Sequence, residues 1–132
     1  LTEEHLEMFQ ELIALRDLQV KRDYGIQEVA LTMDKGLADI LITNLLKNAV
    51  VHNEEGGQIV CRVIDSKLEI GNSGKVLGFK ESDLFKRFVR DTTKTGNFGL
   101  GLSIAKKICD HYGFDIQYDY RNSMHYFSIN FN

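Results

Sequence analysis

The sequence contains no proline, only two cysteines and no long apolar run among its 132 residues. Its apolar runs are too short to cross a bilayer and no signal-peptide pattern is present, so we expect a cytoplasmic domain without direct membrane contact. Cys61 and Cys109 lie in apolar patterns on different elements, and their spacing matches no zinc or redox motif. We therefore expect two buried thiols in a reducing compartment.

Neither sign of charge is in strong excess. The net charge of −3 argues against a broad polyanion-binding face, and hence against a nucleic-acid partner, so any anion site must be local. The chain is 43% hydrophobic and 27% charged, which is ordinary globular composition, and it is long enough to form a core. No internal repeat or low-complexity linker divides it. We expect a single domain over residues 1–132.

A predicted helix over residues 37–52 organises the rest of the chain. Residues four apart share one face of a helix, so Asn44 and Asn48 lie on the same side as Leu37, Leu41 and Leu45. The two asparagines therefore interrupt the apolar side. An amide buried there is costly unless it forms hydrogen bonds.

Two interpretations of these amides are open from the residues alone. In the first, they cap neighbouring backbone or bridge a buried water. In the second, they serve a metal–nucleotide site, because Mg²⁺ prefers oxygen ligands and takes only one or two from the protein, with phosphates and water completing the shell. An amide oxygen can fill this role without adding negative charge beside a triphosphate.

The flanking segments show helix and strand patterns. We predict an amphipathic helix over about residues 3–22, with His5 solvated on its charged face, and Asp34 as the cap of the central helix. The strand at residues 58–65 is apolar on both sides and is expected to be covered on both faces. The other predicted elements are strands at residues 26–33, 67–70, 114–120 and 125–131, a glycine turn at residues 71–74 and a short helix at residues 83–88.

A polar segment over residues 90–98 leads into a glycine-led helix that begins at residues 99–101 and ends at Gly113. Glycines at a helix start expose backbone N–H groups beside the positive end of the helix dipole, which suits a phosphate. The spacing Gly-x-x-Gly-x-Gly matches neither the P-loop nor the dinucleotide fingerprint.

With these motifs in this order, the chain resembles the catalytic, ATP-binding domain of bacterial sensor histidine kinases, within the wider GHKL group of ATPases and kinases. The likeness covers nearly the whole chain and is strongest over residues 37–113. It implies an α+β fold, the two-layer α/β sandwich called the Bergerat fold, with a mixed sheet of about five strands covered on one face by about three helices. It also implies ATP and Mg²⁺ as cofactors and a lid over residues 89–98.

The resemblance gives each motif a role. Asn44 and Asn48 match the N box, in which the second asparagine binds Mg²⁺ and the first supports the phosphate end. Asn72 and Gly74 match the first glycine box, which recognises adenine; residues 85–88 match the F box. The implied nucleotide contacts are Asn44, Asn48, His52, Asn72, Gly74, Arg90, Lys94, Gly96, Phe98, Gly99, Leu100, Gly101 and Leu102, with Arg90 and Lys94 as charge-assisted donors to phosphate.

The chain departs from the family pattern at several positions. Val51 replaces a basic residue, and Ile40 stands where the family often has Glu or Gln, which suits transfer to histidine better than hydrolysis of ATP. Val76 replaces a glycine, and no late Gly-Thr signature is recognisable at residues 123–126. Asn72 replaces an aspartate, and an amide can accept or donate whereas a carboxylate only accepts. We therefore expect looser base discrimination than in relatives with aspartate.

The implied function is a kinase domain that presents the terminal phosphate of Mg-ATP to a histidine. That histidine would lie on a separate dimerisation domain of the same full-length kinase, with a response regulator downstream. Because this phosphoacceptor hairpin is absent from the chain, we expect no self-phosphorylation. Two rivals share the pocket: a serine kinase of the anti-sigma-factor type, and a degenerate nucleotide-binding module that works by docking.

Overall fold

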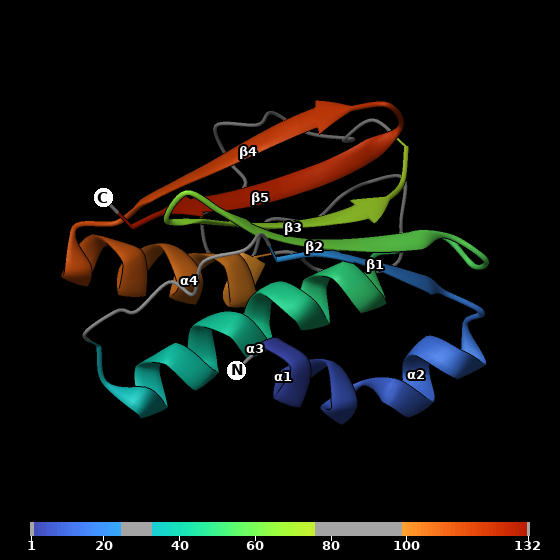
Figure 1. Cartoon of the computed structure of the whole chain (residues 1–132), viewed down its shortest axis with the longest axis horizontal. Coiled ribbons are helices and arrows are strands. Elements are labelled where there is room, and N and C mark those ends of the chain that lie inside the picture. Colours follow the sequence, from blue (N-terminus) through green and yellow to red (C-terminus); the bar gives the residue numbers. More distant parts are fainter. Residues whose placement is uncertain (1, 25–32, 76–98, 132) are drawn as a thin grey trace.

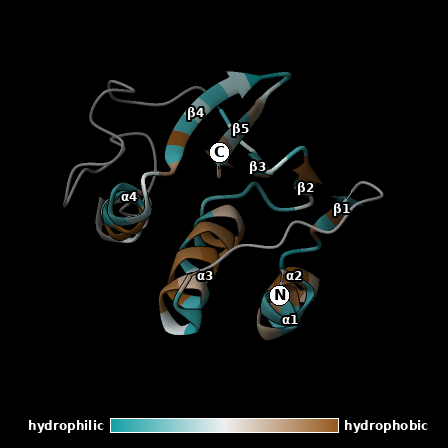
Figure 2. Ribbon diagram, turned by 60° about the vertical axis from the view of Figure 1, so that its left-hand side comes forward, coloured by the Kyte–Doolittle hydropathy of each residue, from teal (hydrophilic) through white to brown (hydrophobic). Residues whose placement is uncertain are grey.

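The computed structural model describes residues 2–24, 33–75 and 99–131. In these ranges the chain forms a five-stranded mixed sheet in the order β1-β2-β3-β5-β4, with the helices on one face (Figure 1, Figure 2). The predicted α+β, two-layer architecture is confirmed. The helices are α1 (Thr2–Met8), α2 (Gln10–Leu15), α3 (Lys35–Val51) and α4 (Gly99–Tyr112), and the strands are β1 (Gln19–Asp23), β2 (Gln58–Ile64), β3 (Lys67–Ser73), β4 (Asp115–Arg121) and β5 (Met124–Asn130).

The sheet combines one parallel strand pair with three antiparallel pairs. β1 runs parallel to β2 at one edge, and the pairs β2–β3, β3–β5 and β4–β5 are antiparallel. Asn122 and Ser123 join β4 to β5 with positive φ angles of 53° and 59°, as tight hairpin turns require. The predicted terminal hairpin is confirmed, and its second strand lies inside the sheet rather than at its edge.

The core lies between the sheet and the helices. Strand residues alternate between the two faces of a sheet, so Ile59, Cys61, Ile70, Phe127 and Ile129 share the helix-facing side. They pack with apolar side chains of the helices. The main helix contributors are Leu6, Leu41, Leu45, Leu46, Ala49, Val50, Leu102, Ala105, Ile108 and Cys109.

The two helices nearest the candidate site form as the sequence predicts. The side chain of Asp34 caps α3 by accepting a hydrogen bond from the backbone N–H of Leu37 at 3.0 Å. α4 ends before Gly113, which has a φ of 71°, a conformation that favours glycine.

The N-terminal segment differs from the predicted single helix. α2 ends at Leu15, Asp17 takes a positive φ of 56°, and residues Gln19–Asp23 pair with β2. Apart from Val20, which packs against the core, these residues are polar, and all five are exposed or half-buried. Their strand conformation depends on hydrogen bonds to β2, and the local sequence pattern gives no sign of this pairing.

His5 is buried, which makes the prediction of a solvated histidine wrong. Its Nε2 lies 3.2 Å from Oδ1 of Asp39, so it joins α1 to α3. α1 is also tied to β1, because Arg22 and the Tyr24 hydroxyl both donate to Glu3. The hydrogen bond from Tyr24 holds the pKa of the Glu3 carboxyl below its ordinary value.

Both cysteines are buried thiols, as predicted. Burial raises the pKa of Cys61 and of Cys109 to about 11.

Two expectations about the sheet are corrected. Among the described residues the helices lie on one face of the sheet, so helices do not cover β2 on both, and Ile64 on the other face is 39% exposed. Gly71 lies within β3 rather than in a turn. A Cβ atom there would lie 2.5 Å from the ring of Tyr126, so the glycine admits an aromatic ring across the strand.

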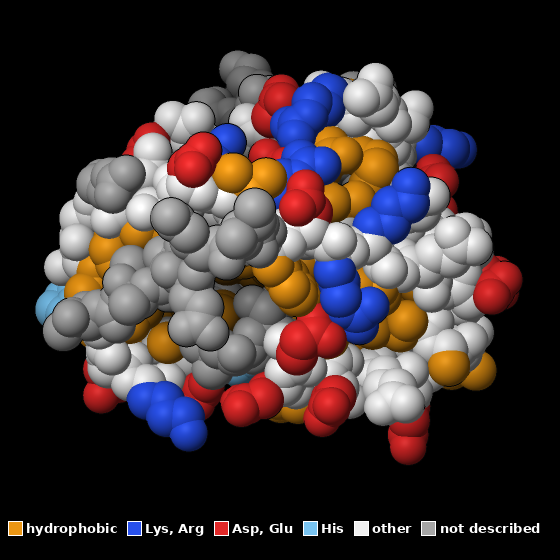
Figure 3. Space-filling view, viewed as in Figure 1, with side chains coloured by type: hydrophobic (Ala, Val, Ile, Leu, Met, Phe, Trp, Pro, Cys, Tyr) orange, Lys and Arg blue, Asp and Glu red, His pale blue; other side chains and the backbone are white. Residues whose placement is uncertain are grey.

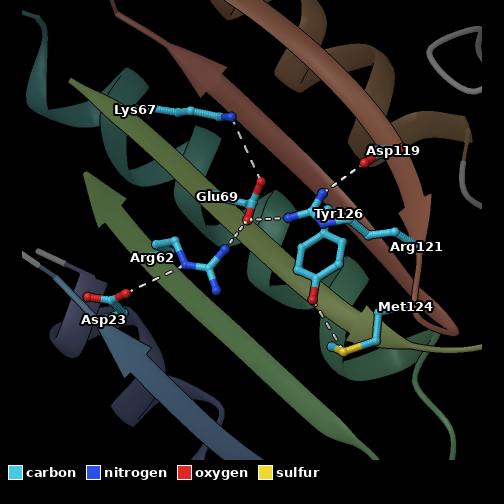
Figure 4. Close-up of polar contacts among 8 residues, drawn as sticks. All are labelled: Asp23, Arg62, Lys67, Glu69, Asp119, Arg121, Met124 and Tyr126. Atoms are coloured by element: carbon cyan, nitrogen blue, oxygen red, sulfur yellow. Dashed lines mark hydrogen bonds and ion pairs between the residues drawn. The ribbon is translucent and has the colours of Figure 1, made fainter. Parts of the chain in front are cut away.

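The face of the sheet away from the helices, here called the outer face, carries a network of ion pairs (Figure 4). Glu69 on β3 accepts from Arg62 on β2 at 2.8 Å and from Arg121 on β4 at 2.9 Å. The Arg121 guanidinium also lies 3.7 Å from the ring centroid of Tyr126 on β5. Asp23 on β1 lies 3.7 Å from Arg62, so the network crosses every strand. Figure 3 shows interspersed basic and acidic side chains over the sheet.

Several predicted elements lie outside the described residues. These are most of the strand at residues 26–33, the helix at residues 83–88 with Phe85 and Phe88, and the lid at residues 89–98. In the part of the chain that the structure describes, no helix has both the length and the apolar character needed to cross a membrane.

Candidate functional site

α3 places three candidate side chains at one-turn intervals. Asn44 and Asn48 are followed by His52, the C-cap residue, whose backbone N–H donates to the carbonyl of Asn48 at 3.0 Å. Asn48 is 8% exposed and His52 is 7% exposed, while Asn44 is half-buried. The polar groups therefore lie within an otherwise apolar helix face, as the spacing predicts.

The amide of Asn48 has an unmet hydrogen-bonding requirement. Its Nδ2 is buried and has no hydrogen-bond partner in the structure. A flip of the carboxamide exchanges its nitrogen and oxygen, so the oxygen can occupy the position that has no hydrogen-bond partner. A buried amide of this kind fits a cation whose other ligands are phosphate oxygens and water. Nδ2 of Asn48 therefore caps no backbone carbonyl, whereas a bridging water and a metal–nucleotide site both remain open as its role.

The first turn of α4 lies against Asn44. A Cβ atom on Gly101 would be 3.4 Å from Asn44 Oδ1, so the glycine keeps the space beside this amide open. Gly99 and Leu100 begin the helix, where backbone N–H groups lack intrahelical partners. Leu102 is fully buried in the core, so its side chain anchors the turn and only its backbone is available to a ligand.

Asn72 lies at the end of β3 on the helix-facing side. It is 2% exposed, and its Nδ2 donates to the carbonyl of Ser73 at 3.1 Å and toward that of His52 at 3.5 Å. Carbonyl oxygens only accept, so these two groups fix the orientation of the amide. Oδ1 is then the atom that Asn72 can offer as an acceptor to a base.

Gly74 is held by the terminal hairpin. Its N–H donates to the carbonyl of Ser123 at 3.1 Å, and its carbonyl accepts from the Tyr120 hydroxyl at 3.0 Å. The first glycine box is thus fixed by residues from the far end of the chain. Neither Tyr120 nor Ser123 was a candidate from the sequence, since only the folded sheet brings them to Gly74.

His125 is a further polar residue at this end of the sheet that the sequence did not single out. It is the register partner of Asn72, is 4% exposed, and its Nδ1 lies 2.6 Å from the Tyr118 hydroxyl. The alternation of the last strand places its side chain on the helix-facing side, but only the pairing of β3 with β5 reveals what it faces.

The structure thus brings Asn44, Asn48 and His52 together on α3, with Gly101 against Asn44 and Asn72 beside the end of α3. The remaining candidates, Arg90, Lys94, Gly96 and Phe98, lie outside the described residues.

Residues 33–130 match the family model described as histidine kinase-, DNA gyrase B- and HSP90-like ATPase. The chain belongs to this ATPase family. The match spans α3, the sheet from β2 onward and α4, which are the elements that carry the candidate site. Membership in the ATPase family identifies ATP as the ligand for which these elements are arranged.

The ATPase domain is similar to regions of bacterial sensor kinases. It is 29% identical over 123 residues to the adaptive-response sensory kinase SasA of Crocosphaera subtropica, covering 86% of the chain and 32% of the relative. It is 35% identical over 109 residues to the sensor protein CiaH of Streptococcus pneumoniae, covering 76% of the chain and 24% of the relative. The chain spans a third or less of the length of these curated relatives.

Solved structures of histidine kinases share the fold. The catalytic domain of histidine kinase ThkA superposes with a TM-score of 0.75 at 25% identity, over 97% of the chain and 87% of the ThkA domain. ThkA in complex with the response regulator protein TrrA gives a TM-score of 0.73 at 22% identity, over 96% of the chain and 37% of that structure.

Replacing Gly101 with alanine is expected to weaken ATP binding roughly tenfold without destabilising the fold. The methyl group would fill the space beside Asn44 Oδ1, whereas alanine is a better helix former than glycine. Calorimetric titration with ATP and a thermal melt measure the two effects. Lys107→Ala, an exposed change on the same helix, is the control. Unchanged affinity for ATP in Gly101→Ala would show that the space beside Asn44 is not part of the site.

Proposed function

We propose that this domain binds Mg-ATP and transfers its terminal phosphate to a histidine on a separate domain of a larger sensor kinase. The observation that carries the proposal is the buried, unpartnered Nδ2 of the Asn48 amide, in a helix that lies within the match to the ATPase family. The likeness to sensor kinases supports histidine as the acceptor. All of the curated relatives and solved structures compared above are sensor or histidine kinases, so the serine-kinase alternative is not favoured.

Different residues would bind the adenine end and the phosphate end of the nucleotide. Asn72 Oδ1 would accept a hydrogen bond from the amino group of adenine, while the glycine-led start of α4 offers backbone N–H groups to the phosphates. Asn48, supported by Asn44, would hold Mg²⁺, which when bound neutralises charge on the phosphates. Phosphoryl transfer asks mainly for positioning and charge neutralisation, and this set of residues supplies both.

The acceptor histidine and the response regulator are proposed partners outside the chain. His5 does not serve as acceptor, because it is buried against Asp39 between α1 and α3. The complex of ThkA with its response regulator protein supports the second partner by similarity of fold.

The isolated domain is expected to bind ATP without labelling itself from ATP that carries a radioactive γ-phosphate. Adding the phosphoacceptor domain of the full-length kinase should restore labelling, and the product should be lost in acid, because phosphohistidine is acid-labile. Labelling of the isolated chain, or an acid-stable product, would contradict the proposal.

A further inference from the structure

We propose that His125 is a specificity-determining residue of the ATP site, and that its imidazole donates a hydrogen bond to N1 of adenine beside the acceptor Asn72. The inference rests on the proposed binding of ATP and extends it to the recognition of the base.

The pairing of β3 with β5 places the two side chains next to each other. Asn72 and His125 are directly opposite in the antiparallel register, and directly opposite residues have Cβ atoms about 4.5–5.5 Å apart. Both side chains are on the helix-facing side, because Ile70 and Phe127, two residues away on each strand, lie in the core. Both are almost fully buried, at 2% and 4% exposure. A buried amide and a buried imidazole thus occupy neighbouring positions on the helix-facing side of the sheet.

The hydrogen bond from Tyr118 sets the proton on the imidazole. The Tyr118 hydroxyl lies 2.6 Å from Nδ1 of His125. The direction of this hydrogen bond depends on the tautomer of the ring. Because a phenol is a stronger acid than a neutral imidazole N–H, we infer the tautomer in which the hydroxyl donates and Nδ1 accepts. In the neutral ring the proton then resides on Nε2, because the partner of one ring nitrogen determines the protonation of the other.

The position of the ring is restricted from a second side. The ring of Tyr120 packs against the imidazole with centroids 4.8 Å apart, and the Tyr120 hydroxyl donates to the carbonyl of Gly74. The same tyrosine therefore links His125 to the loop that follows Asn72. A side chain held in place before binding loses less conformational entropy when it binds the base.

The pair then presents an acceptor next to a donor. Asn72 is oriented by two carbonyl groups so that Oδ1 accepts, and His125 carries an N–H at Nε2. Adenine offers the complementary edge, an amino donor at N6 and an acceptor at N1. Guanine offers an oxygen at position 6 and an N–H at N1, so both contacts would be mismatched. Buried polar groups left unpaired make such a mismatch costly. The structure therefore predicts a strong preference for ATP over GTP, contrary to the looser discrimination expected from Asn72 alone.

The test compares ATP with 1-deaza-ATP, in which a C–H group replaces N1, by calorimetric titration. The wild-type domain should bind 1-deaza-ATP roughly tenfold more weakly than ATP. His125→Phe should bind the two nucleotides equally, and His125→Gln, which retains an amide donor, should recover part of the difference. Tyr118→Phe should also reduce the ratio, because it releases the imidazole from the required tautomer without changing a residue next to Asn72.

The exposed His111 on α4 supplies the matched control, and His111→Gln should leave the ratio unchanged. Thermal melts confirm that each variant is folded, and the ratio of two nucleotides on one variant is independent of a general loss of affinity. Equal binding of ATP and 1-deaza-ATP by the wild type, or an unchanged ratio in His125→Phe, would overturn the assignment of His125. Failure of the wild type to bind ATP at millimolar concentration would instead overturn the proposed function.

Discussion

Replacing Asn48 with leucine is expected to reduce the affinity for Mg-ATP on the order of 100-fold and to leave the weaker, magnesium-free binding of ATP nearly unchanged. Leucine has the same branching and number of side-chain heavy atoms as asparagine but no oxygen for a cation. The substitution also removes a buried polar atom that has no hydrogen-bond partner in the structure. We therefore expect no decrease in the free energy of unfolding. The effect is therefore confined to the magnesium-dependent part of the binding free energy.

Calorimetric titrations with ATP, with and without Mg²⁺, measure this difference directly. Lys47→Ala is the control, because Lys47 is an exposed neighbour on the same helix. If the wild type binds ATP with the same affinity in both conditions, or if Asn48→Leu lowers both affinities equally, Asn48 does not hold the cation. A rise in thermal stability of the variant would fit the removal of an unsatisfied amide.

Replacing Glu69 with alanine is expected to destabilise the domain by roughly 2–3 kcal/mol, without changing its affinity for ATP. The carboxylate is 7% exposed and is the common acceptor for Arg62 and Arg121, with Lys67 at 4.0 Å. Its loss would leave three cations converging on the outer face. The cost is below the roughly 3–5 kcal/mol of a fully buried pair, because both arginines are 38% exposed and can regain water.

A chemical denaturation curve measures the loss, and a thermal melt should shift by about 4 °C for each kcal/mol. Asp119→Asn is the control: this partner of Arg121 is 62% exposed, so the change should cost roughly 0.5 kcal/mol or less. ATP affinity should be unchanged, because Glu69 and Asn72 project from opposite faces of β3. A melting temperature within a degree of the wild type would show that the network contributes nothing to stability.

The elements with strong local signals were predictable from the sequence. Asp34 marks the start of α3 and Gly113 the end of α4, because a cap and a left-handed glycine are local requirements of a helix. Asn44 and Asn48 were found in the same way, since a spacing of four residues places two amides on one apolar face. The position of Gly101 beside Asn44 depends on how α3 and α4 pack, and no spacing rule gives it.

The elements that depend on distant partners were not predictable. β1 is a mostly polar segment whose strand conformation depends on its pairing with β2. His5 lies in a charged stretch, yet the packing of α1 on α3 buries it against Asp39. The pairing of Asn72 with His125 is a property of the β3–β5 register, which the alternation of either strand leaves undetermined.

The central position of β5 also bears on the order in which the domain can be completed on the ribosome. α3, with both N-box asparagines, leaves the ribosome before β5, the strand that pairs with β3 and ends at Asn130. Until that strand has left the exit tunnel, β3 lacks one neighbour and the core lacks Phe127 and Ile129. A nascent chain stalled before β5 would therefore expose apolar side chains to chaperones and proteases, and nucleotide could stabilise the domain only once β5 has paired with β3.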